Sequence, residues 1–199
     1  MTPFLRSDAQ GAVLAETLLD PRVEISVSEV ARRAEVLPAV AHREVSRLIE
    51  AGVLKDRRDG NNRLVSANTQ HPLWSLMSQL VAETYGPVPV LRDLLREIPG
   101  VDQAFIYGSW AVRRSGTAGP PPRDVDVLVV GQPSRGDVLD VAEVAGQRLR
   151  TEVNIHLVSR EAWDARSDPF LKTVADRPLI ALTSTESTLA RDRRSDQAT

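Results

Sequence analysis

The sequence lacks several features that would assign it to common classes of protein. None of its 199 residues is cysteine, which excludes a disulfide framework and a thiolate metal site. No apolar run approaches the ~18 residues of a membrane-spanning helix, and the first residues do not resemble a signal peptide. The net charge is only −2, so binding to nucleic acid would require a local basic patch. We therefore expect a soluble, cytoplasmic protein that has no membrane partner.

Residues 1–68 have the pattern of a small helical domain that ends in a hairpin. Ser26 followed by Glu29 is a capping-box pattern that opens a helix. Pro38 suits the first position of a further helix, and Gly52 suits its end. The spacing of apolar residues predicts helices over 8–19, 26–34 and 38–52, followed by apolar runs on either side of an Asp-Gly turn.

Helix, short helix, helix and hairpin is the order of elements in a winged helix-turn-helix. The first 68 residues resemble the bacterial ArsR- and MarR-like regulators in the phrase EVARRAEV…REVSRLIEAGVLKDRRDGNNRLVSAN. The resemblance implies a double-stranded DNA operator as partner, with the third helix in the major groove and the hairpin, or wing, on the backbone. The implied DNA-contacting residues are Ala39, His42, Arg43 and Arg47 in the helix, and Arg57, Arg58, Asn61, Asn62 and Arg63 in the wing.

The local charge supports DNA binding only modestly. From Arg32 to Arg63 there are eight Lys and Arg residues against five Asp and Glu residues. An alternative interpretation is that these side chains form ordinary solvated faces on a wing that contacts protein. Residues 69–89 are predicted to form a linker helix, and in related regulators such helices pack a dimer, so a homodimer is expected.

Residues 90–184 alternate strands with helices, which is typical of an α/β domain. We therefore predict a two-domain α/β (α+β) fold whose second domain has a mixed sheet. The predicted strands cover 102–107, 124–130 and 152–158, and a last apolar stretch covers 178–182. The predicted helices of this domain cover 90–98, 109–114, 137–149, 160–165 and 169–175. Residues 185–199 lack apolar periodicity and are predicted to be a disordered tail.

Two short motifs in the second domain indicate a metal–nucleotide site. Asp124 and Asp126 alternate with apolar residues on a strand, so both carboxylates lie on one face and repel each other. A divalent metal is the usual compensation. Gly108-Ser109 ends a strand and opens a helix, which offers backbone N–H groups and a hydroxyl to a phosphate. The alternative is a carboxylate pair at a turn edge of a plain α/β domain.

Gly-Ser at a strand end followed by Asp-x-Asp on the next strand resembles the polymerase-beta-like nucleotidyltransferase superfamily, and most closely its minimal members. The resemblance implies that Gly108 and Ser109 hold a nucleoside triphosphate. It also implies that Asp124 and Asp126 hold Mg²⁺ (or Mn²⁺). Arg113, on the helix after Ser109, either meets a phosphate or is solvated.

The sequence departs from that family at the third acidic position, which is occupied by Asn154. Asparagine can coordinate a metal but cannot take a proton. Glu152 lies on the same strand face and is the candidate catalytic acid beside Asp124 and Asp126. His156, two residues beyond Asn154, acts as a base or a phosphate contact, or is structural. A Gly/Pro-rich insert over 115–122 either covers the nucleotide site or is a surface loop.

These observations leave three functions open. The first is a DNA-binding transcriptional regulator whose second domain binds Mg-nucleoside triphosphate as a sensor. The second is an active nucleotidyltransferase that moves a nucleotidyl group to a hydroxyl of a small molecule, protein or RNA. The third is a component of a toxin–antitoxin system.

Overall fold

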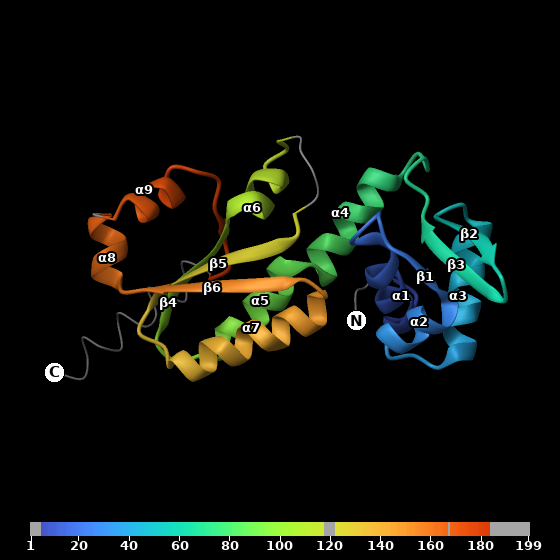
Figure 1. Ribbon diagram of the computed structural model, residues 1–199, viewed down its shortest axis with the longest axis horizontal. Coiled ribbons are helices and arrows are strands. Elements are labelled where there is room, and N and C mark those ends of the chain that lie inside the picture. The colour runs from blue at the N-terminus through green and yellow to red at the C-terminus, as the bar shows by residue number, and fades with distance from the viewer. Residues whose placement is uncertain (1–4, 118–121, 167, 184–199) are drawn as a thin grey trace. The chain divides into compact units, whose positions relative to one another are not determined.

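The computed structural model describes residues 5–117, 122–166 and 168–183, and the chain divides into two compact units, 1–86 and 87–199. The fold is mixed α/β with two sheets, as predicted for the fold class (Figure 1). No helix within the described residues has both the length and the apolar composition of a membrane span. The predicted tail and the central part of the Gly/Pro-rich insert lie outside the described residues.

The first unit contains helices packed on a small antiparallel sheet of strand order β1-β3-β2. Its elements are α1 (Asp8–Leu18), β1 (Glu24–Ser26), α2 (Val27–Arg33), α3 (Pro38–Glu50), β2 (Leu54–Asp59), β3 (Asn62–Ala67) and α4 (Trp74–Tyr85). The predicted start of α2 is confirmed, because the Ser26 hydroxyl accepts a hydrogen bond from the Glu29 N–H at 3.1 Å. The predicted hairpin is also confirmed, with Asp59 paired to Asn62 across the turn.

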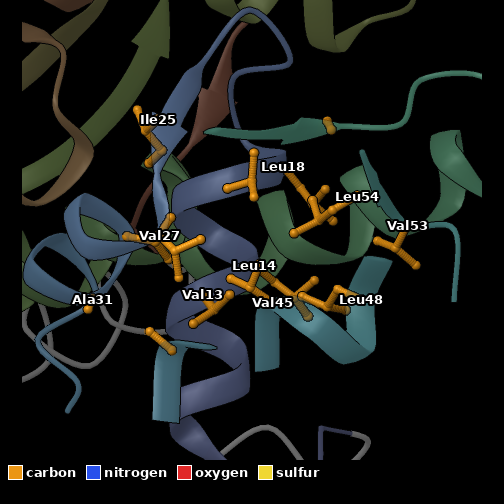
Figure 2. Close-up of a cluster of buried hydrophobic side chains, with 14 of the residues drawn as sticks. Val13, Leu14, Leu18, Ile25, Val27, Ala31, Val45, Leu48, Val53 and Leu54 are labelled. Atoms are coloured by element: carbon orange, nitrogen blue, oxygen red, sulfur yellow. The ribbon is translucent and has the colours of Figure 1, made fainter. Parts of the chain in front are cut away.

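The core of the first unit joins α1, α2, α3 and the sheet. Figure 2 shows Val13, Leu18, Val45 and Leu54 converging from three elements, and each is at most 2% exposed. Helix α4 belongs to the same unit, because its Val81 is buried in this core. The segment predicted as a linker thus contributes apolar surface to the first unit.

The second unit is built on a mixed sheet of strand order β6-β5-β4-β7, in which β5 and β6 are parallel and β4 is antiparallel to its neighbours. The mixed sheet predicted from the sequence is therefore confirmed. The elements are α5 (Pro87–Arg96), β4 (Val101–Tyr107), α6 (Gly108–Arg114), β5 (Asp124–Gly131), α7 (Arg135–Leu149), β6 (Glu152–Val158), α8 (Arg160–Ala165), α9 (Pro169–Ala175) and β7 (Ile180–Ala181).

Helix α5 begins earlier than predicted. The Pro87-Val88-Pro89 segment was expected to precede the helix, yet it forms its first turn. The N–H groups of a first helical turn have no intrahelical acceptor, so proline loses no hydrogen bond there. The two prolines therefore open the helix and do not break it.

The two faces of the second sheet are covered differently. Val125, Val127 and Val129 of β5 are buried in a core that also contains Leu91 of α5 and Val141 of α7. On the other face, the later residues of β5 pack against α8 and α9. Figure 1 shows α5 and α7 on one side of this sheet and α6, α8 and α9 on the other. Asp124 and Asp126 lie at the start of β5, on the face that carries α8 and α9 further along.

Candidate functional site

The register of two parallel strands gathers polar side chains on one face of the second sheet. Asp124 of β5 pairs with Glu152 of β6, and Asp126 pairs with Asn154. Since side chains alternate along each strand, these four residues project from the same face. On the other side of β5, Tyr107 of β4 lies opposite Asp126. The start of this face is therefore a patch of three carboxylates and an amide beside a tyrosine.

The three carboxylates in this patch repel one another. Burial raises the pKa of Asp126 above its ordinary value, and the charges of Asp124 and Glu152 raise it further. The amide of Asn154 donates a weak hydrogen bond to Asp126 Oδ1 at 3.5 Å, which lowers the same pKa. Burial, followed by the charges of Asp126 and Asp124, also raises the pKa of Tyr107. A bound cation would relieve this repulsion.

Gly108 brings the start of α6 directly against the Asp126 carboxylate. Its φ is +73°, a left-handed conformation that side-chain-bearing residues rarely adopt, and a Cβ there would lie 2.5 Å from Asp126 Oδ2. The sequence suggested this glycine for phosphate binding, whereas the structure adds a steric reason for it. A side chain at this position would force the Asp126 carboxylate out of its present place.

The available ligands suit a magnesium ion whose shell is completed by other molecules, and they do not suit a site made of protein ligands alone. Within the described residues, no group of three or more His, Cys, Asp or Glu side chains is arranged to hold a metal by itself. Mg²⁺ is usually bound through one or two carboxylates, with phosphate oxygens and water completing its shell. Asp124 and Asp126 supply two such carboxylates, and Ser109, the residue after Gly108, is exposed. The residues therefore fit a magnesium ion that arrives with a phosphate ligand.

Two other predicted site residues are held by neighbouring groups. Arg113 donates a hydrogen bond to the Thr117 carbonyl at 2.9 Å, so its guanidinium is tied to the segment after α6. The imidazole of His156 packs against the ring of Phe170, with 4.9 Å between ring centroids. Phe170 was not predicted from the sequence, because nothing near it in the chain relates α9 to β6.

The residues predicted to contact DNA lie on the surface of the first unit. Ala39, His42, Arg43 and Arg47 are exposed on α3. On the hairpin, Arg57, Arg58, Asn61 and Asn62 are exposed, and Arg63 is half-buried. The Arg63 guanidinium lies 3.4 Å from the Ser46 hydroxyl, which connects the hairpin to α3. The helix and the hairpin therefore present their polar residues as parts of one unit.

Several of these arginines already have acidic partners. Arg47 lies 3.3 Å from Glu44, Arg57 lies 2.6 Å from Glu24, and Arg63 lies 2.7 Å from Asp56. The hydrogen bond from Arg57 lowers the pKa of Glu24. Arg43 and Arg58 have no ion pair among the residues that the structure describes. These two side chains are the best candidates for contacts with phosphate.

Replacement of Asp126 by asparagine is expected to raise the melting temperature at pH 7 without divalent metal. The raised pKa of Asp126 means that the folded protein favours the protonated carboxyl, so ionisation costs stability at neutral pH. Asparagine removes that cost. The gain should decline as the pH falls through the folded pKa and vanish below about pH 4, the ordinary aspartate value. Thermal unfolding with a chelator across this range measures it.

Addition of magnesium and nucleotide should affect the two proteins differently. Magnesium added with nucleotide should raise the melting temperature of the wild type, because a ligand that binds only the folded state stabilises it. The Asp126→Asn variant should not respond. A variant that is less stable than the wild type at pH 7 without metal would contradict the electrostatic interpretation.

No protein-family model matches this chain, and a search of curated proteins also finds no match.

Proposed function

We propose that this protein is a DNA-binding transcriptional regulator whose second unit binds a nucleoside triphosphate together with Mg²⁺ or Mn²⁺. The observation that carries the nucleotide part is the approach of Gly108 to Asp126, on a strand that also holds Asp124. This arrangement supports the resemblance to polymerase-beta-like nucleotidyltransferases, in which Gly-Ser and Asp-x-Asp belong to one site.

The proposed roles follow from the chemistry of each group. Asp124 and Asp126 would hold the metal, which when bound would supply positive charge against the phosphates. The backbone N–H and hydroxyl of Ser109 donate to phosphate oxygens. Asn154 occupies the register position beside Asp126 and cannot accept a proton from an attacking hydroxyl. Binding without turnover, as in a sensor, is therefore the favoured mode.

A second candidate function is a nucleotidyltransferase, and the position of Glu152 favours it. Glu152 pairs with Asp124 in the strand register, and its charge acts on Asp126. In this reaction Glu152 takes the proton from an acceptor hydroxyl, the hydroxyl oxygen bonds to the α-phosphorus, and pyrophosphate leaves. The acceptor would be a small molecule, a protein or an RNA.

Incubation with labelled triphosphates, Mg²⁺ and cell extract separates the two functions. A sensor leaves every acceptor unlabelled but changes its DNA affinity when Mg-nucleotide binds. An enzyme transfers label, and Glu152→Gln abolishes that transfer while nucleotide binding persists. Failure of the protein to bind Mg-nucleotide at all would remove both candidates.

The DNA-binding part is supported by the order of elements in the first unit. Helices α2 and α3 are followed by the β2–β3 hairpin, and β1 pairs with β3 at the sheet edge. This order agrees with a winged helix-turn-helix, so α3 is proposed to enter the major groove.

A homodimer is proposed as well, because Leu73, Leu76 and Leu80 are exposed at helical spacing. Sedimentation of the purified chain tests the dimer.

Arg43→Ala is expected to weaken binding to duplex DNA and to flatten its salt dependence by about one unit in the log–log slope. The reason is that Arg43 is exposed and has no acidic partner within the described residues. Fluorescence anisotropy over a salt series measures both quantities. Arg92→Ala removes the same charge from α5 of the second unit and should change neither. Equal slopes for the wild type and Arg43→Ala would remove this residue from the DNA surface.

A further inference from the structure

Three aromatic side chains form a cluster next to the carboxylate patch. The ring of Phe170 lies 5.9 Å from that of Tyr107 in an edge-on arrangement, and 4.9 Å from that of His156. Tyr107 comes from β4, His156 from β6 and Phe170 from α9, so the cluster exists only in the folded unit. We call these three residues the aromatic cluster.

Core packing does not account for the position of Phe170. Its helix supplies Leu171 and Val174 to a buried group with Leu128 and Trp163, and both are at most 4% exposed. Phe170, in contrast, remains 38% exposed. His156 is exposed as well. Two rings therefore face solvent beside a core that is already closed by other residues of the same helix.

The start of α9 is well defined locally, which holds the Phe170 backbone in place. The Asp168 carboxylate caps the helix by accepting a hydrogen bond from the Phe170 N–H at 2.6 Å. Pro169 occupies the first helical position, where its fixed φ suits the helix. A ring on such a fixed turn loses little further freedom when a ligand packs on it.

The aromatic cluster and the carboxylate patch share an edge. Tyr107 lies directly opposite Asp126 and immediately precedes Gly108. His156 is two residues beyond Asn154 on β6, so both project from the same face. A ligand that is held by its phosphates at Asp124 and Asp126 would thus have aromatic surface next to it.

We propose that the aromatic cluster, and Phe170 above all, stacks on the base of the nucleoside triphosphate bound at the carboxylate patch. This inference rests on the proposed nucleotide-binding function. It adds a contact to the base, which the metal–phosphate site does not hold. Stacking on an aromatic ring accepts any base, because each base has a π-face. The cluster would therefore give affinity for nucleotides over inorganic polyphosphate without selecting strongly among bases.

The test compares MgATP, MgUTP and magnesium tripolyphosphate by calorimetric titration. The wild type is expected to bind both nucleotides more tightly than tripolyphosphate. Phe170→Ala should weaken nucleotide binding about tenfold, the loss of one base-stacking contact, and leave tripolyphosphate binding unchanged. Phe170→Leu, which keeps apolar bulk without a π-face, should show a similar loss. Phe170→Trp should retain the affinity.

A matched control is Leu139→Ala on α7. Leu139 is 69% exposed, and α7 covers the opposite face of the sheet, so no ligand affinity should change. Equal binding of nucleotides and tripolyphosphate by the wild type, or no effect of Phe170→Ala, would overturn the stacking role and leave the metal–phosphate site standing. Equal loss of all three ligands in Phe170→Ala would also overturn it. Failure of the wild type to bind any of the three would instead remove the proposed nucleotide function.

Discussion

Replacement of Gly108 by alanine is expected to lower the free energy of unfolding by about 1–2 kcal/mol and to weaken magnesium–nucleotide binding. The left-handed backbone at Gly108, with φ of +73°, costs a side-chain-bearing residue about 1–2 kcal/mol. The added Cβ would lie 2.5 Å from Asp126 Oδ2, which is the free end of a half-buried side chain, so the carboxylate can turn aside at little further cost to stability. Urea unfolding measures the stability, and calorimetry measures the binding.

The effect on binding should arise because the clash falls on a proposed metal ligand. The Asp126 carboxylate or the start of α6 must move to admit the methyl group. Gly116→Ala provides the control, because Gly116 also has a positive φ of +94° but no described atom within 4 Å of an added Cβ. That variant should lose about 1–2 kcal/mol from its backbone alone and keep its nucleotide affinity. A Gly108→Ala protein with the nucleotide affinity of the wild type would show that the position of the Asp126 carboxylate beside Gly108 does not matter for binding.

Replacement of Asp124 by alanine is expected to reduce magnesium-dependent nucleotide binding at least about 100-fold. Loss of a residue that merely orients a metal ligand costs about 10–100-fold, so loss of a ligand should reach the upper end. The fold should persist, because Asp124 is half-buried and its charge raises the pKa of Asp126. Removing it therefore relieves repulsion between carboxylates.

Calorimetric titration with MgATP and the melting temperature without metal test this prediction together. Asp140→Ala removes a carboxylate from the exposed face of α7 and should affect neither measurement. Nucleotide binding that persists in Asp124→Ala, with its magnesium dependence intact, would exclude Asp124 as a ligand. The metal site would then have to be sought elsewhere in the second unit.

Local signals in the sequence predicted the elements well where a residue acts on its own neighbours. Ser26 caps α2 as expected, and Gly52 lies just past the end of α3 as expected, in a left-handed conformation with φ of +71°. Strand β1 was missed, because three residues are too short to show a period. Residues 87–89 were assigned to the linker, whereas they form the first turn of α5, where proline is tolerated.

The candidate site was predictable only in part, because local signals do not specify contacts between residues that are far apart in the chain. The alternation of Asp124 and Asp126 on a strand follows from the period of two and needs no tertiary information. The aromatic neighbours do not, since Phe170 reaches Tyr107 only through the packing of α9 on the sheet. The charge that the first unit presents to a partner was also not predictable from the sequence. Composition counts Arg57 as basic, but its pairing with Glu24 depends on the order of the strands.

What the sequence by itself determined is most of the elements, the carboxylate pair and the glycine at the end of β4. These follow from periodicity and from the conformational limits of single residues, which act over a few positions. Tertiary structure alone decided that Gly108 lies against Asp126 and that Asn154 pairs with Asp126 across the strands. It also decided that the rings of the aromatic cluster, which are distant in the chain, border the carboxylate patch. Such contacts join residues far apart in the chain, and their geometry is set by strand register and helix packing, which short-range preferences do not specify.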